Sequence, residues 1–553
     1  MTTMFSTSTT NNTTQQPPAN RSIIQWVTGY LLLLGTIARL FPLFDLQHRL
    51  FWQYMTEDGY LLQTVARNLA CGRGMTVSDG TIVTNGFQPL FTFLSAGLFM
   101  LTDGSKFRGI ILVTLFSLLI AISSAWLVQK IARRASIGLS GSLAWLAAAS
   151  WFAAPHIIRH SMNGLETGLY WLMMLMTLNY WLDITRPGAQ PVNLNRRLAL
   201  GVLLGFTFLA RNDAVFFIAA LLLTHVLIRP ASRPFTASLT DAIIAGVTSI
   251  VIASPWLINN VMLFGSIVPI SGKAESYGAH FAHNLSHIPA TIVDSTLLYL
   301  PIPVHLESTL PVAAVCTLAI LLFIAALRPL LRQQNVVAGQ FFWLTLILLA
   351  EISAYYGLMF GATHFLQRYF SVLTPLLWLT WAAVLVRVVG PGWQASRAMA
   401  IPTLLIVAAL ASGFALRDYQ RGYAMGTAQE HENVVNWVTS HIPNNVWVGA
   451  IQSGTLGYFH DRTINLDGKV NPAALRALIQ HGNILPYAEQ SPVSYIADWS
   501  TPGFRSWLDP VLHPDFTRQF FLRYRNDHDN VMIMQRRSDA PAAPLTTSLG
   551  AAR

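Results

Sequence analysis

The sequence contains, from Glu57 to Phe91, the stretch EDGYLLQTVARNLACGRGMTVSDGTIVTNGFQPLF. It follows the first hydrophobic segment, so the adjacent carboxylates of Glu57 and Asp58 lie beside a membrane. A carboxylate in that position costs free energy unless it is solvated or paired, and it therefore marks a functional site as a first hypothesis. The alternative is structural, because Asp58 is also a residue type that caps a helix by accepting backbone N–H groups.

The same stretch predicts a helix that carries both charges. Leu61, Val65 and Leu69 recur every four residues, which is typical of one helix face. Glycines at 72 and 74 predict the end of this helix. Arg67 lies on it, so one rigid element can hold an acid and a cation.

Composition places the chain among multispanning membrane proteins. Of 553 residues, 53% are hydrophobic and 11% are charged, whereas soluble domains carry about 25% charged residues. Cys71 and Cys316 form neither a disulfide framework nor a zinc or redox motif. The net charge of +10 comes from Lys and Arg in short loops between apolar runs, which indicates membrane topology and not nucleic-acid binding.

The hydrophobic runs predict about eleven spans of roughly 20 residues within 21–417. Residues 1–20 are expected to be a disordered cytoplasmic tail. The apolar segment 86–101 is too short for a full crossing. If it stays on one side, the arginine-rich loops are cytoplasmic, and the first extracytoplasmic loop, 45–107, contains the acidic pair.

After the last span, the composition changes. Residues 418–536 contain more charge and more turn residues, with β-like runs at Val446–Ile451 and Val531–Met534. An amphipathic helix is predicted over Asn433–Ile442. We therefore expect a small extracytoplasmic α/β domain, followed by a disordered tail at 537–553.

Ionisable residues recur where the other outer loops meet the spans. They are Glu166 in MNGLETG, Arg211 and Asp213 in FLARNDA, Lys273 in PISGKAES, and His364 and Arg368 in ATHFLQRYF. Most of these residues have a structural alternative. Glu166 could be favourably placed at a helix N-terminus, and Arg211 and Asp213 could form a local pair. Lys273 could be a solvated loop lysine, and Arg368 could snorkel to the interface. Together they describe a site with an acid for proton abstraction and cations to neutralise a phosphate.

Several motifs resemble those of GT-C fold glycosyltransferases, especially bacterial members related to the mannosyltransferase-like family 39 group. The matching pieces are the acidic pair followed by ARNLA, G-x-G, DG and TNGFQPL, then NGLETGLY, LARNDA, GSIVPISGK, QRYFSVLTPLL and QSGTLGYFHDRTINLDGKVN. The first loop lacks the His-Pro-Pro of protein mannosyltransferases and the sequon-binding motif of oligosaccharyltransferases, which disfavours protein acceptors of those kinds.

The resemblance implies a polyprenyl-phosphate sugar as donor and an inverting transfer in which an Asp of the first loop is the base. In several relatives this Asp stands nine positions before the Arg of the AR pair, which here leads from Arg67 to Asp58. Glu57 then has a supporting role, and Lys273 and Arg368 match basic positions near the phosphate. No metal cluster is evident, although Glu57, Asp58, Glu166 and Asp213 could supply oxygen ligands.

The sequence thus predicts a GT-C type hexosyl- or pentosyltransferase of the bacterial inner membrane. It would transfer a sugar to a hydroxyl of an envelope polysaccharide or glycolipid on the extracytoplasmic side, with Asp58 and Glu57 as catalytic residues. Arg67, Glu166, Arg211, Asp213, Lys273, His364 and Arg368 are the predicted substrate-binding residues, and no cofactor is expected. A lipid-linked-sugar flippase or a non-catalytic protein of the same fold is the alternative.

Overall fold

The computed structural model describes residues 18–135, 137–139, 141–186, 188, 192–300, 302, 306–331, 335–389, 393–423, 431–501 and 516–537. The predicted tails, 1–20 and 537–553, lie almost entirely outside the described residues.

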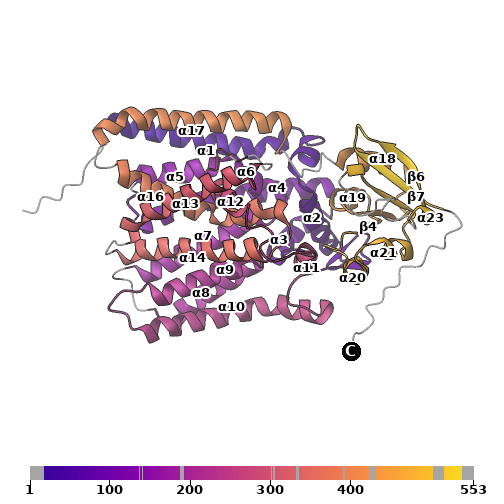
Figure 1. Cartoon of the computed structure of the whole chain (residues 1–553), viewed down its shortest axis with the longest axis horizontal. Helices are drawn as coiled ribbons and strands as arrows, with labels where there is room; N and C mark the ends of the chain where they lie inside the picture. Colours follow the sequence, from indigo (N-terminus) through magenta and orange to yellow (C-terminus); the bar gives the residue numbers. More distant parts are fainter. Residues whose placement is uncertain are drawn as a thin grey trace, which may run out of the picture.

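Long helices lie side by side in a bundle, with α1 and α17 along one edge and α10 along the opposite edge (Figure 1). The bundle helices are α1 (Pro18–Leu40), α3 (Pro89–Met100), α4 (Lys106–Arg134), α5 (Gly141–Ala153), α6 (Pro155–Met162), α7 (Thr167–Thr185), α8 (Leu194–Ala210), α9 (Ala214–Leu227), α10 (Phe235–Phe264), α13 (Leu310–Leu331), α14 (Val336–Leu358), α16 (Thr374–Val389) and α17 (Trp393–Arg421). Shorter elements at one end are η1 (Phe41–Phe44), η2 (Arg49–Tyr54), α2 (Glu57–Ala70), β1 (Thr76–Val77), β2 (Ile82–Val83), α11 (Ile270–Ser276), α12 (Ile288–Asp294), η4 (Thr363–Phe365), α15 (Leu366–Phe370) and η5 (Ser371–Leu373).

Among the described residues, six helices are long and apolar enough to cross a membrane, or seven if the bent pair of α5 and α6 is one span. The chain is therefore an integral membrane protein, but the predicted count of about eleven spans is not confirmed. Helix α3 has 12 residues, or about 18 Å at 1.5 Å per residue, well below the roughly 30 Å of a hydrocarbon core. This length agrees with the prediction that segment 86–101 is too short to cross.

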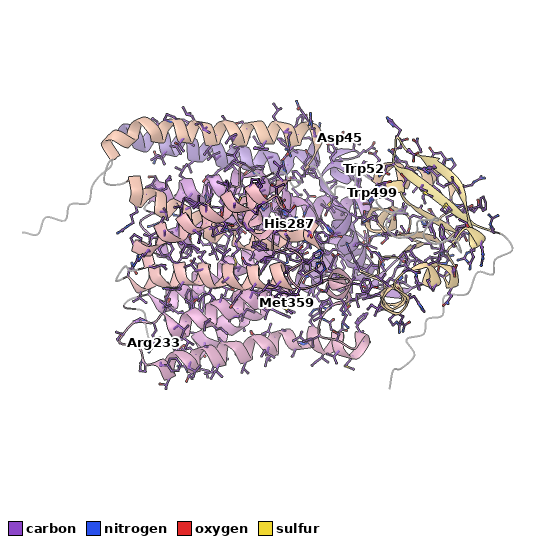
Figure 2. All side chains as sticks on the ribbon, in the orientation of Figure 1. Asp45, Trp52, Arg233, His287, Met359 and Trp499 are labelled. Atoms are coloured by element: carbon purple, nitrogen blue, oxygen red, sulfur yellow. The ribbon has the colours of Figure 1, made fainter. Side chains whose placement is uncertain are left out.

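The two ends of the bundle differ in character. Figure 2 shows Asp45, Trp52 and Trp499 at the end that carries the C-terminal residues, and Arg233 at the other end. Helix α4 runs between these ends: Lys106 at its start contacts Asp461 of the C-terminal region, and Arg133 and Arg134 lie in its last turn. The acidic stretch and the C-terminal region therefore share one end of the bundle, as the loop assignment predicted.

Asp58 is not the N-cap residue of helix α2. The N-cap residue is Thr56, whose hydroxyl accepts a hydrogen bond from the Gly59 amide at 3.1 Å. The capping alternative for Asp58 is therefore wrong, and its carboxylate is free to contact other elements. The helix ends at Ala70, and Gly72 and Gly74 follow it with φ angles of 74°, as the sequence predicted.

The C-terminal region folds as a mixed five-stranded sheet with helices on both faces. Its elements are α18 (Glu432–His441), β3 (Val448–Ala450), α19 (Gly454–Phe459), β4 (Thr463–Asn465), α20 (Pro472–His481), α21 (Leu485–Gln490), β5 (Tyr495–Trp499), α23 (Phe516–Gln519), β6 (Phe520–Asn526) and β7 (Val531–Arg536). The strand order is β4-β3-β5-β7-β6, with β3 parallel to β4 and β5, and β7 antiparallel to β5 and β6. Helices connect the parallel strands, because a parallel pair needs a crossover.

Both faces of this sheet are buried. Neighbouring residues of β5 point to opposite sides: Ala497 packs in one hydrophobic cluster with Val438 of α18, and Ile496 packs in a second cluster with Leu478 of α20. The second cluster also contains side chains from the first loop, namely Val65, Val77, Ile82 and Phe87. The C-terminal region and the first loop therefore share a hydrophobic core.

The contact between these two parts is tight enough to test at one glycine. A Cβ atom at Gly86 would lie 2.1 Å from the backbone oxygen of Lys469 in the C-terminal region. We expect Gly86→Ala to lower the free energy of unfolding by about 1–3 kcal/mol, because backbone must move to make room. Thermal unfolding of the purified protein, followed by tryptophan fluorescence, measures this.

The matched control is Gly97→Ala in α3, where a Cβ would meet nothing within 4 Å. This substitution is expected to leave stability unchanged, or to raise it by up to about 1 kcal/mol through helix propensity. Equal melting temperatures for the two variants would contradict the close contact at Gly86.

Candidate active site

The N-terminus of α2 packs directly on the loop that carries Glu166. Thr56 donates a hydrogen bond from its hydroxyl to the Asn163 carbonyl at 3.0 Å, and the Gln63 side chain donates to the Gly164 carbonyl at 2.9 Å. A Cβ at Gly59 would lie 2.4 Å from the Asn163 oxygen. Only glycine permits this close approach, which brings the EDG and NGLE motifs together.

Arg368 of α15 joins the two acids that this contact brings close. Its Nη1 donates to Asp58 Oδ2 at 3.2 Å, and its Nη2 donates to Glu166 Oε1 at 3.0 Å. The Glu166 side chain is 1% exposed, whereas that of Asp58 is 25% exposed. Glu166 is therefore the buried support of the guanidinium, and Asp58 is the carboxylate that a substrate could reach.

A second arginine extends this cluster. Arg211 is 2% exposed; its Nε lies 3.1 Å from Asp213 Oδ1 and 3.8 Å from Glu166 Oε1. Its guanidinium also stacks over the ring of Tyr369 at 4.8 Å. The Tyr356 hydroxyl donates to Asp213 Oδ2 at 2.8 Å. Arg211 and Asp213 thus form the local pair that the sequence allowed, and they also join Glu166.

Three atoms of the cluster lack a hydrogen bond. Among the described residues, Glu166 Oε2, Arg368 Nε and Asp213 Oδ1 are buried without a hydrogen-bond partner, although Asp213 Oδ1 is ion-paired with Arg211. Buried polar atoms are nearly always satisfied, so a water molecule or a substrate group is expected beside them.

Glu57 does not join this cluster. Its carboxylate accepts hydrogen bonds from the Gly454 amide, from the Thr455 amide at 2.9 Å and from the Thr455 hydroxyl at 2.5 Å. His431 lies 3.5 Å away. The structure therefore places Glu57 at the N-terminus of α19, where a carboxylate satisfies free helix amides, and not beside Asp58 as a second acid of the site.

Arg67 also faces the C-terminal region. Its Nη1 lies 3.4 Å from Asp461 Oδ1, and its Nε donates to the Gly104 carbonyl at 3.0 Å. Lys106 bonds the same carboxylate at 2.8 Å. The predicted substrate-binding role of Arg67 finds no support in this placement, because the helix turns its side chain away from Asp58.

Of the two remaining predicted residues, Lys273 is exposed on α11, and no polar contact of its side chain is seen among the described residues. His364 is exposed but lies within the electrostatic reach of Asp58. Residues that the sequence reasoning missed take the inner positions: Glu275 of α11 binds Lys469 of the C-terminal region at 2.8 Å. The signal was present, since Glu275 is two residues after Lys273, and Lys469 directly follows the NLDG turn.

The remaining motifs contact one another around this site. Asn85 of TNGFQPL donates to Asn260 Oδ1 at 3.0 Å and accepts from the Ile270 amide at 3.1 Å. Gln88 of the same motif accepts from the Asn212 amide at 3.1 Å. The first loop thus holds the end of α10, the start of α11 and the ARND turn in fixed positions.

The donor set does not fit a metal ion. Arg368 already pairs with the carboxylates of both Asp58 and Glu166. Within the described part of the chain, no group of three or more His, Cys, Asp or Glu could hold a metal ion. We therefore assign no step to a metal.

Comparison with solved structures found proteins of similar fold. ArnT from Cupriavidus metallidurans bound to undecaprenyl phosphate has a TM-score of 0.57 at 11% identity, over 95% of this chain and 99% of that chain. The archaeal oligosaccharyltransferase AglB from Archaeoglobus fulgidus, in complex with an inhibitory peptide and a dolichol-phosphate, has a TM-score of 0.56 at 13% identity, over 93% of this chain and 75% of that chain. The fold is that of the GT-C glycosyltransferases.

Comparison of the sequence with family models and with curated proteins gives no further support for the GT-C assignment. Residues 417–533 match a family model described as a domain of unknown function (DUF8728). No curated protein matches the chain.

Arg368 is the residue on which the cluster depends, and its removal tests this. We expect Arg368→Gln to lower the free energy of unfolding by about 3–5 kcal/mol, because it leaves Asp58 and buried Glu166 without their cation. Thermal unfolding in detergent measures the loss. Arg328→Gln, at an exposed position near the end of α13, is the control and should stay within about 0.5 kcal/mol of wild type. Equal losses of stability in Arg368→Gln and Arg328→Gln would show that the cluster does not depend on Arg368.

Proposed function

We propose that this protein is an inverting glycosyltransferase that moves a hexosyl or pentosyl group from a polyprenyl-phosphate donor to an acceptor hydroxyl. The observation that carries the proposal is the partly exposed Asp58 carboxylate at the N-terminus of α2, bonded on one oxygen to an arginine that Glu166 holds from behind. The GT-C neighbours, solved with undecaprenyl phosphate and dolichol-phosphate, support this donor class.

In the proposed reaction, Asp58 accepts the proton of the acceptor hydroxyl as its oxygen attacks the anomeric carbon. The bond between that carbon and the phosphate oxygen breaks, and the polyprenyl phosphate leaves with the electron pair. Attack from the side opposite the phosphate inverts the anomeric centre. Asp58 suits the role of base because its carboxylate is accessible, whereas Glu166 is buried behind the guanidinium.

The arginines stabilise the negative charge that develops on the departing phosphate. Arg368 uses Nη1 and Nη2 on the two acids, and its unpartnered Nε remains as a donor. Arg211 is fixed by Asp213 and Tyr369 and contributes its charge from behind. We propose that the reaction takes place on the extracytoplasmic face of a bacterial inner membrane, with an envelope polysaccharide or glycolipid as acceptor.

The test is sugar transfer by the purified protein in nanodiscs, using a panel of radiolabelled polyprenyl-phosphate sugars with crude envelope acceptors. Asp58→Asn is expected to lower the transfer rate by at least about 10²–10⁴-fold, the contribution of a general base. The active donor identifies the sugar.

Asp103→Asn is the matched control, because Asp103 is an exposed aspartate at the same end of the bundle, in a turn with a φ of 52° that asparagine also adopts. It should transfer sugar at the wild-type rate. Equal rates for wild type and a folded Asp58→Asn protein would exclude Asp58 as the base.

A further inference from the structure

Lys469 lies in a rigid loop of the C-terminal region, between β4 and α20. The Lys469 amide donates to Asp467 Oδ1 at 2.9 Å, and the Gly468 amide donates to Asn465 Oδ1 at 3.0 Å. Asn471 ties the end of the loop back to the Asn465 carbonyl at 2.7 Å. These bonds fix the backbone from which the lysine side chain extends toward the bundle.

The ammonium group of Lys469 reaches the candidate active site. Its Nζ lies 2.8 Å from Glu275 Oε1 and 5.0 Å from the centre of the Phe365 ring. The same ring lies 5.9 Å from the guanidinium of Arg368. Both cations therefore lie near the Phe365 ring, and Asp58, which pairs with Arg368, also acts electrostatically on Lys469.

The charges around Lys469 keep it protonated. Burial alone would lower its pKa, but Asp58, Glu275 and Asp467 outweigh this effect and raise the pKa above the ordinary lysine value. The side chain is 20% exposed. An ammonium has three donors, and Glu275 is its one ion-pair partner among the described residues, so the group can bind a further anion.

We propose that the C-terminal region completes the active site by supplying Lys469, which binds the phosphate group of the lipid-linked donor. This inference rests on the proposed function. It replaces exposed Lys273 with a lysine from a different part of the chain, and it gives the C-terminal region a direct part in donor binding.

The charge balance of the site shows why this cation is needed. The carboxylates of Asp58, Glu166, Asp213, Glu275 and Asp467 face the cations Arg211, Arg368 and Lys469. Burial raises the pKa of Asp467 to about 6. An anionic phosphate enters a site with more acids than bases, and each cation therefore contributes to its affinity.

The test measures the donor KM and kcat of the full-length protein in nanodiscs. Lys469→Gln should raise the donor KM about 10- to 100-fold, the worth of a hydrogen bond to a charged group, with a smaller effect on kcat. Lys469→Arg should restore most of the affinity. Arg476→Gln, which removes an exposed cation from α20 of the same region, should behave like wild type.

Glu275→Gln separates phosphate binding from a structural role. If Lys469 only ties α11 to the C-terminal region, both partners of the ion pair are equally needed, and either variant raises the KM. If Lys469 binds phosphate, Glu275→Gln removes a competing carboxylate and lowers the KM. A higher KM in both Lys469→Gln and Glu275→Gln, or an unchanged KM in Lys469→Gln, would overturn the proposal.

Binding of undecaprenyl phosphate without sugar, measured by microscale thermophoresis, distinguishes failure of this inference from failure of the proposed function. Absence of sugar transfer by wild type would refute the proposed function alone. In that case, weaker binding in Lys469→Gln together with tighter binding in Glu275→Gln would still support the phosphate site. Equal binding by wild type and both variants would exclude it.

Discussion

The first turn of α2 is the constraint on which the other contacts depend. Glu57 and Asp58 are consecutive, and consecutive helix residues point about 100° apart. Glu57 therefore receives the amides at the start of α19, while Asp58 receives the guanidinium of Arg368. One rigid helical turn thus fixes the C-terminal region and the Asp58 carboxylate relative to each other, and any movement of one shifts the other.

Buried charge explains how the bundle supports this turn. An isolated buried guanidinium is costly, and the cost is offset only when carboxylates pair with it. Arg211 and Arg368 come from different turns of the bundle and meet at Glu166, which pairs with both. This sharing makes the arrangement of α7, the ARND turn and α15 specific, because displacement of any one element breaks at least one ion pair with Glu166.

Much of this arrangement could be predicted from the sequence, and the rest depended on contacts between distant segments. Local patterns gave the α2 helix, the α18 helix and strands near Val446 and Val531. They also selected Asp58, Glu166 and Arg368, since charges at the ends of apolar runs are recognisable one by one. Lys469 and Glu275 were missed because their pairing joins segments far apart in sequence. Glu57 and Arg67 were predicted for the site but contact the C-terminal region, because helix periodicity does not specify which segment each helix face contacts. The predicted span count is not confirmed, because several bundle helices are shorter than a full crossing.

The shared core indicates that the C-terminal region is not a separable module. Val65, Val77, Ile82 and Phe87 of the first loop are buried in the same cluster as Ile464 and Ile496 of the sheet. Each such side chain contributes about 1.5–3 kcal/mol when buried, so exposing four of them would cost as much as the roughly 5–15 kcal/mol that holds a typical domain folded. The first loop carries Asp58, and its fold therefore requires the sheet. The region that supplies Lys469 therefore also packs against the helix that carries Asp58, so its contribution to the site is structural as well as electrostatic.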